Sequence, residues 1–371
     1  MPLSLLDLVQ EKKKVFVLLG PGGVGKTTCS IGLAVYAAMQ GKRVGLLSID
    51  PARRLASALG LSFEGKPTVL KFDEALAGSV EASMLDQKAM FDHMVHRYAP
   101  SPEVAEKIIR HPLYLAASTH LSGSIEYMAL ARLQEMVEDR RYEIVVLDTP
   151  PDGHALDFLS RPDVLSRFRE QRVMNWLVKP FLFAAKLGIG RLMNLGEKLM
   201  GGVAQVTGFK ALQSLAEFLV LIQQVIDGFH SASEKVLKTL RDSSTSFFLV
   251  TAPTPPGIRT GLALGTQLGA IGYGLDGVIL NRLLPREIRR ELGAYQTEES
   301  PQQAGKLSAA AFLSQLGQRK INEQGVRSEL LAKLSKIHAR ELITLEIDEK
   351  PYAIHNPSSL FQFASSFVVK D

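Results

Sequence analysis

Residues Gly20 to Thr28 read Gly-Pro-Gly-Gly-Val-Gly-Lys-Thr-Thr, and this stretch constrains the fold more than any other. It follows the apolar run 15–19 and opens a helix-like run from Cys29 to Gln40. A G-x-x-x-x-G-K-T loop between a strand and a helix is the pattern of a phosphate-binding loop, because its glycines let successive backbone N–H groups point at a polyphosphate. The helix behind it adds the positive end of its dipole. The stretch therefore predicts nucleotide binding.

The loop assigns a task to each of its polar residues. Lys26 would reach the β- and γ-phosphates, and the Thr27 hydroxyl would hold Mg²⁺. A glycine-rich turn that merely joins a strand to a helix is the alternative, and the full motif in this context argues against it. The candidate nucleotide-binding residues of the loop are Gly20, Gly22, Gly23, Val24, Gly25, Lys26, Thr27 and Thr28.

Two further apolar runs end in an aspartate. The run 43–49 leads into Asp50, and the run 144–147 leads into Asp148. Ligands of α/β proteins bind at the carboxyl ends of parallel strands, where these carboxylates would meet the loop. In P-loop enzymes such an aspartate holds Mg²⁺ or its water shell. The pattern predicts an α/β P-loop NTPase fold, with a mostly parallel sheet that helices cover.

Helical patterns interrupt the strand pattern twice. We predict one domain over residues 1–371, into which a helical subdomain of about 85–140 and 161–242 is inserted. The nucleotide-binding core is then about 12–84, 141–160 and 243–371. The helices within 174–226 are unusually apolar, which suits either a core of their own or a groove for an apolar client. The sequence leaves both interpretations open.

Composition excludes several kinds of site. The chain of 371 residues has one cysteine, Cys29, so it can form neither an intramolecular disulfide nor a cysteine-based zinc site. His93, His96 and His111 have no companions at ligand spacing and are not expected to bind a metal. We find no signal peptide and no charge-free run that reads as a membrane span, which predicts a cytoplasmic protein. The net charge of +5 is spread out and carries little weight.

With the loop, Asp50-Pro51-Ala52 and the segment 148–154 in order, the chain resembles the ArsA-type ATPases. These comprise the arsenite-pump ATPases and the guided-entry ATPases that deliver tail-anchored membrane proteins. The resemblance implies ATP and Mg²⁺ as ligands, and Lys26 and Asp50 as catalytic residues, with Asp50 positioning the attacking water. It also implies that Asp148 supports Mg²⁺, through water, and that Asn281 contacts the adenine. Members work as dimers that close around ATP and reshape the helical subdomain, which suggests a hydrophobic protein client.

The chain departs from the family pattern in three places. Pro21 stands where the family usually has a second lysine, which reaches the nucleotide of the opposite subunit. The zinc-binding and metalloid-binding cysteines are absent, so arsenite transport is not expected. Arg53 and Arg54 follow Asp50, and they would either form exposed salt bridges or replace the lost lysine as an arginine finger. The partner would be a second copy of this chain or a lysine-bearing paralogue.

Three interpretations of function follow. The leading one is a dimeric switch that hydrolyses Mg·ATP and controls a helical client- or partner-binding subdomain. The alternative is a scaffold, or an asymmetric partner of a lysine-bearing paralogue, that binds ATP but hydrolyses it weakly; Pro21 favours it. A partitioning or division-site ATPase is a third, but there is no basic amphipathic tail helix and no basic run that suggests DNA. We therefore expect neither nucleic-acid partners nor a direct membrane span.

Overall fold

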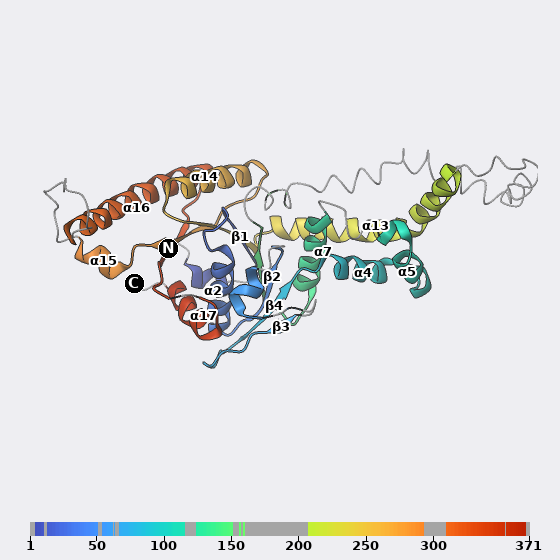
Figure 1. The fold of residues 1–371 in the computed structure, drawn as a ribbon, viewed down its shortest axis with the longest axis horizontal. Helices are drawn as coiled ribbons and strands as arrows, with labels where there is room; N and C mark the ends of the chain where they lie inside the picture. Colours follow the sequence, from blue (N-terminus) through green and yellow to red (C-terminus); the bar gives the residue numbers. More distant parts are fainter. Residues whose placement is uncertain are drawn as a thin grey trace, which may run out of the picture. The chain divides into compact units, whose positions relative to one another are not determined.

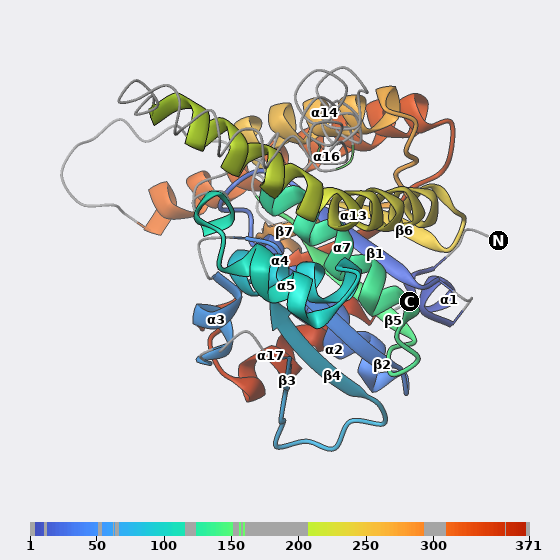
Figure 2. The same ribbon diagram turned by 90° about the vertical axis from the view of Figure 1, so that its right-hand side faces the viewer.

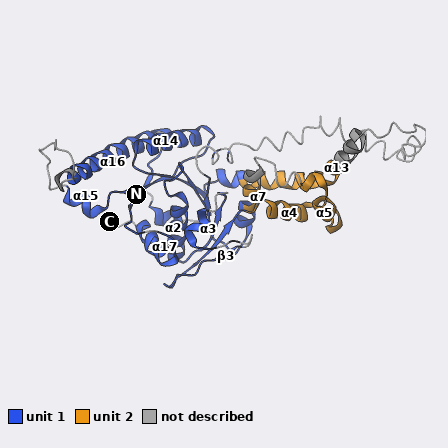
Figure 3. Ribbon diagram, viewed as in Figure 1, with its two compact units in different colours: residues 1–85, 133–160, 237–371 blue, residues 86–132, 161–236 orange. Residues whose placement is uncertain are grey.

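The computed structural model describes residues 4–10, 13–50, 54–61, 63, 67–115, 124–150, 156, 159, 207–292, 309–352 and 354–368. The chain divides into two compact units (Figure 3). Unit 1 comprises residues 1–85, 133–160 and 237–371, and unit 2 comprises 86–132 and 161–236. That the helical insertion is a subdomain with a task of its own stays a prediction.

Unit 1 is built on one sheet of eight strands in the order β3-β4-β2-β5-β1-β6-β7-β8. Figure 2 labels β1 to β7 of this sheet. All neighbouring strands are parallel except β3 and β4, which are antiparallel. This confirms the α/β fold class. The strands are β1 (Val15–Leu19), β2 (Arg43–Ser48), β3 (Thr68–Val69), β4 (Ser79–Met84), β5 (Ile144–Asp148), β6 (Thr245–Thr251), β7 (Gly277–Leu283) and β8 (Ile343–Asp348).

Helices cover the two faces of this sheet, which is why its central strands are apolar without alternation. Every residue of β1 and of β5 is buried. On one face, Phe248 and Val250 of β6 belong to a core that α2 (Lys26–Met39) and α17 (Pro357–Ala364) complete. On the other face, Leu249 and Thr251 lie against Gly261 of α14 (Pro255–Ala270), which packs on α16 (Ala309–His338). Figures 1 and 2 both show α14 and α16 apart from α2 and α17.

The element boundaries differ from the sequence predictions at three places. The helix after the loop begins at Lys26 instead of Cys29, because the last loop residues already form its first turn. The sequence suggests a short strand over 69–72, and the structure has only the two-residue β3 there. The apolar run 277–280 predicts a strand that ends at Asn281-Arg282, and β7 instead continues to Leu283. The remaining helical elements of unit 1 are α1 (Leu5–Gln10), α3 (Arg54–Leu59), α15 (Arg286–Glu291) and the short 3-10 turn η2 (Ser365–Phe367).

Over the residues described, unit 2 consists of helices. It contains α4 (Gln87–Tyr98) and α5 (Pro102–Ile109), with parts of α7 (Ser124–Glu138) and α13 (Thr207–Arg241). Phe218 and Val225 of α13 are buried in one cluster with residues of α4 and α5. Phe218 and Val225 therefore belong to a core, whereas Val220 of the same helix is 37% exposed. Residues 174–206, the rest of the open question, lie outside the described residues.

Two classes of feature are absent from the part of the chain that the structure describes. No helix there combines the length and the apolar character needed to cross a membrane. The same residues contain no cluster of three or more histidine, cysteine or acidic side chains that could hold a metal ion by themselves.

Candidate nucleotide-binding site

The loop between β1 and α2 has the backbone that a phosphate cradle requires. Gly23 and Gly25 adopt left-handed φ values of 78° and 89°, which glycine tolerates best. Gly25 is also the N-cap of α2, and as a glycine it has no side chain that could cap the first turn of that helix. A Cβ on Gly20 would lie 2.1 Å from the carbonyl oxygen of Val250, so only glycine fits. The N-terminus of α2 is thus left open toward an anion.

Lys26 lies in this loop with only 6% of its surface exposed. Its Nζ atom donates to the carbonyl oxygen of Gly20 at 2.8 Å and to that of Pro21 at 3.2 Å. The buried ammonium group of Lys26 is therefore hydrogen-bonded to carbonyl oxygens of the same loop that would bind the phosphates. Phosphate oxygens would offer it stronger, charge-assisted bonds.

Asp148, the last residue of β5, is fully buried beside the loop. Its Oδ2 accepts from the Ser48 hydroxyl at 2.9 Å, its Oδ1 accepts from the Ser30 hydroxyl at 3.2 Å, and Thr27 also donates to it. Burial raises the pKa of Asp148 to about 6, although these hydrogen bonds and the charge of Lys26 act in the opposite direction. A hydroxyl and a carboxylate side by side are hard oxygen donors that fit Mg²⁺.

Asp50 lies two residues beyond the end of β2 and is 5% exposed. Its Oδ2 forms an ion pair with Arg54 Nη1 at 2.9 Å. Its backbone N–H donates to the Ser48 hydroxyl at 3.4 Å, and that same hydroxyl donates to Asp148. Ser48 thus connects the two aspartates. Arg53 and residues 151–155 lie outside the described residues.

Asn281 is 6% exposed, and its side-chain amide donates to the carbonyl oxygen of Val24 at 2.8 Å. This contact joins β7 to the phosphate loop. Asn281 also lines a cavity of about 320 Å³, which opens beside the loop residues Gly25 and Thr28. The other residues that line this cavity are Arg282, Asp348, Glu349, Lys350, Tyr352, Ile354 and Phe363. A nucleoside attached to phosphates in the loop could reach this cavity.

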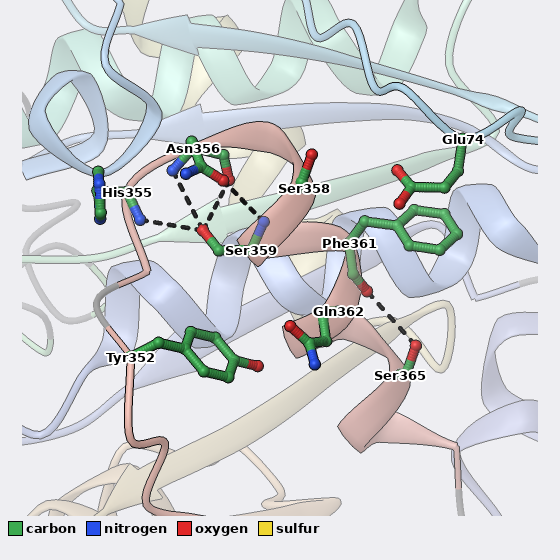
Figure 4. A pocket seen from close by; sticks show the side chains of 9 residues that line it. All are labelled: Glu74, Tyr352, His355, Asn356, Ser358, Ser359, Phe361, Gln362 and Ser365. Atoms are coloured by element: carbon green, nitrogen blue, oxygen red, sulfur yellow. Dashed lines mark hydrogen bonds between the residues drawn. The ribbon is translucent and has the colours of Figure 1, made fainter.

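A second, larger pocket of about 660 Å³ shares Tyr352 with this cavity (Figure 4). Its polar groups are largely engaged with one another at the start of α17. The Ser359 hydroxyl accepts from the backbone N–H of Asn356, whose side chain in turn accepts from the backbone N–H of Ser359. These bonds cap the helix, and no phosphate-loop residue lines the pocket. The smaller cavity is therefore the better candidate for a nucleoside.

Ser30 and Ser48 are site residues that the sequence analysis missed. Ser30 lies three residues after Thr27 on α2, so the helical period places both on the face toward Asp148. Ser48 lies two residues before Asp50, and the register pairs it directly with Asp148. The sequence signal that could have identified them was a serine three residues after Thr27 and a serine two residues before Asp50.

The sheet order, the loop between β1 and α2, and the aspartate at the end of β5 define this chain as a P-loop nucleotide-binding protein of the α/β class. The comparisons with known proteins give the family. The family model described as "Anion-transporting ATPase", ArsA_ATPase, matches residues 13–308. The chain belongs to this ArsA-type ATPase family.

Individual relatives are similar at modest identity. An "ATPase ASNA1 homolog" of Plasmodium falciparum (isolate 3D7) is 29% identical over 215 residues, which are 56% of this chain and 46% of that protein. The "ATPase ARSA2" of Chlamydomonas reinhardtii is 26% identical over 290 residues, 76% of this chain and 71% of that protein. The "ATPase GET3" of Malassezia globosa is 28% identical over 240 residues, 64% of this chain and 65% of that protein. The chain spans about half the length of the Plasmodium relatives.

The raised pKa of Asp148 predicts a pH-dependent stability difference. Burial raises this pKa from 3.8 to about 6, which corresponds to about 3 kcal/mol. Because the folded state binds the proton more tightly, this stabilisation is complete below pH 3.8 and is lost as the pH rises through about 6. Asp148→Asn, which cannot ionise, should therefore gain up to about 3 kcal/mol over the wild type between about pH 4 and pH 7.

Urea unfolding at several pH values, with EDTA and without nucleotide, measures this difference. Asp139→Asn is the matched control, because Asp139 is an acid of unit 1 that lies outside the loop site. A pH-independent difference for Asp148→Asn would show that the pKa of the Asp148 carboxyl is the same in the folded and the unfolded protein.

Proposed function

We propose that this chain is an Mg²⁺-dependent ATPase that acts as a dimeric switch, in which the nucleotide state controls the helical unit. The observation that carries the proposal is the meeting of Lys26, Thr27, Asp148 and Asp50 at one edge of the sheet. The family membership and the names of the relatives support ATP as the nucleotide. Dimer formation and a hydrophobic client rest on the family resemblance alone.

Each residue then has a task in ATP binding. Lys26 would exchange its hydrogen bonds to the Gly20 and Pro21 carbonyls for bonds to the β- and γ-phosphate oxygens. Backbone N–H groups at the start of α2 would bind the remaining phosphate oxygens. Thr27 and Asp148 would hold Mg²⁺, Asp148 through water. When bound, the cation supplies charge that offsets the negative charge of the phosphates.

Asp50 is the candidate for orienting the attacking water. Its carboxylate is buried close to the loop, and Ser48 links its backbone to Asp148. No covalent intermediate is required, because phosphoryl transfer to water depends on positioning and on charge stabilisation. Asn281 would close the nucleoside end of the site, where its amide already bonds the loop.

Phosphate release from ATP by the purified chain tests the proposal. We expect turnover with Mg²⁺ and none with EDTA. ATP binding without turnover under both conditions would refute the hydrolytic switch and favour the scaffold or asymmetric partner, which Pro21 supports. Addition of a lysine-bearing paralogue would then be expected to restore turnover if the asymmetric partner is correct.

We predict that Arg54 contributes to the rate of hydrolysis in a chain that has Pro21 in place of the family's second lysine. Because its guanidinium holds the Asp50 carboxylate at 2.9 Å, we expect Arg54→Ala to lower kcat by about tenfold, the worth of one charge-assisted hydrogen bond, without changing ATP affinity. Arg54→Lys should keep part of the rate, since it keeps the charge but not the planar guanidinium. Single-turnover hydrolysis measures both. An unchanged rate in Arg54→Ala would leave Arg54 as an exposed salt-bridge residue only.

A further inference from the structure

Arg282 has an unusual backbone. Its φ is +65°, and among the residues described only Ala339 is a second non-glycine residue with a positive φ. The left-handed region is unfavourable for residues with a Cβ, so something must hold Arg282 there. Such conformations cluster at ligand sites, where they orient a side chain.

The turn at Arg282 changes which way a side chain faces. Successive residues of a strand normally point to opposite faces of a sheet. Asn281 and Arg282 nevertheless line the same cavity, together with Gly25 and Thr28 of the loop. The register between β7 and β8 shifts between Asn281 and Leu283, which marks a local irregularity at this residue. Irregularities of this kind redirect side chains next to active sites.

A network from α16 fixes this turn. Arg319 Nη2 donates to the carbonyl oxygen of Arg282 at 3.0 Å, and Arg319 Nε donates to Glu323 at 2.8 Å. The buried Glu323 carboxylate also accepts from the backbone N–H of Leu284 at 3.0 and 3.2 Å. The carbonyl of the strained residue and the backbone N–H two residues after it are thus held by hydrogen bonds, which offset the cost of the left-handed conformation.

The guanidinium of Arg282 is exposed, and it has no hydrogen-bond or ion-pair partner among the described residues. Two carboxylates line the same cavity, but other arginines already pair with them. Asp348 Oδ1 is 2.9 Å from Arg289 Nη2, and Glu349 Oε2 is 2.9 Å from Arg319 Nη2. Arg282 is therefore a cation of this cavity that neither of its two carboxylates pairs with, and Lys350 is a second cation in the lining.

The charge of Arg282 also acts at the loop. Burial raises the pKa of the Cys29 thiol in the first turns of α2, and the positive charges of Arg282 and Lys26 both oppose that rise. The Arg282 cation is thus close enough to the start of α2 to act there alongside Lys26. A polyphosphate bound at that helix end would complement both charges.

We propose that Arg282 is a phosphate-contacting residue of the nucleotide site, positioned by its left-handed backbone and by the Arg319–Glu323 pair. This inference rests on the proposed nucleotide binding and adds a charge that the loop motif does not contain. Arg282 supplies this charge from β7 within the same chain. The Arg54 guanidinium, by contrast, forms an ion pair with the Asp50 carboxylate.

Isothermal titration calorimetry with Mg·ATP and with inorganic tripolyphosphate tests the inference. We expect Arg282→Gln to weaken binding of both ligands by about tenfold, the effect of one charge-assisted hydrogen bond. Arg327→Gln is the matched control, because it removes an arginine of α16 that pairs with Glu346 and does not line the cavity. It should bind both ligands like the wild type.

The second variant, Arg282→Gly, separates contact from folding. Glycine accepts the left-handed conformation, so its melting temperature should be unchanged or about 2–4 °C higher, while its affinity falls as in Arg282→Gln. Unchanged affinity in both variants, or weaker ATP binding with unchanged tripolyphosphate binding, would overturn the phosphate contact. A wild-type protein that binds neither ligand would instead overturn the proposed function, and this inference with it.

Discussion

Lys26→Ala is expected to weaken ATP binding by about 3 kcal/mol, on the order of a hundredfold in Kd, and to abolish hydrolysis. The reason is that Lys26 is the buried cation of the loop, and the carbonyl oxygens of Gly20 and Pro21, to which it donates, are neutral acceptors that phosphate oxygens would improve on. Calorimetric titration of Mg·ATP measures the affinity directly.

Lys14→Ala is the control for this variant. Lys14 is an exposed lysine that lies just before β1, at the opposite end of that strand from the loop. Lys14→Ala should bind ATP with the affinity of the wild type. The melting temperatures of both variants should lie within a few degrees of the wild-type value. Binding of ATP by Lys26→Ala with wild-type affinity would show that the loop does not hold the phosphates.

The second large effect is expected at Asp50. Asp50→Asn should lower kcat by about 10²–10⁴-fold while the Kd for ATP changes little, because an amide keeps the shape of the side chain but loses the charge that orients and polarises water. Pre-steady-state phosphate release at saturating Mg·ATP measures the chemical step. The buried position of Asp50 and its ion pair with Arg54 make a matched folding control necessary.

Glu143→Gln supplies that control, since Glu143 is a paired carboxylate at the amino end of β5, away from the loop. Its rate should equal that of the wild type. A wild-type rate in Asp50→Asn would exclude Asp50 as the residue that positions water, and a fall in ATP affinity instead of kcat would assign it to binding.

The fold class could be predicted from the sequence, and so could the position of the residues proposed for one end of the candidate site. Parallel strands that are buried on both faces read as unbroken apolar runs, so β1, β2 and β5 were predictable together with the residues at their carboxyl ends. Lys26 and Thr27 were predictable for a different reason, since the loop is a local motif whose geometry follows from its glycines. The β7 boundary was wrong, because an asparagine after an apolar run looks like a strand end.

The other end of the site depends on contacts that no local pattern encodes. The bond from Asn281 to Val24 joins residues that are 257 positions apart, and the Arg282 turn depends on how β7 pairs with β8. Neither register nor irregularity can be inferred from a single strand's composition. The question of a core or a groove in the apolar helices was likewise answered for Phe218 and Val225 only by their packing against α4 and α5.

The role of Arg54 could not be predicted from the sequence for a different reason. The sequence allowed a salt bridge or an arginine finger, and the ion pair with Asp50 is compatible with the first in this structure. The Arg54 side chain is half exposed although Asp50 is buried, so the guanidinium can turn to another partner when a polyanion binds. The two hypotheses therefore differ in kinetics and are separated by the rate of Arg54→Ala.

The most direct measurement of the central claim is steady-state ATP hydrolysis by the purified chain across a range of protein concentrations, with Lys26→Ala as the blank. A dimeric switch predicts a rate per subunit that rises with concentration to a plateau and is absent in the blank, because the active form assembles from two copies. A rate equal to that of Lys26→Ala at every concentration, in a protein that still binds ATP, would contradict the claim that this chain hydrolyses ATP as a self-sufficient dimer.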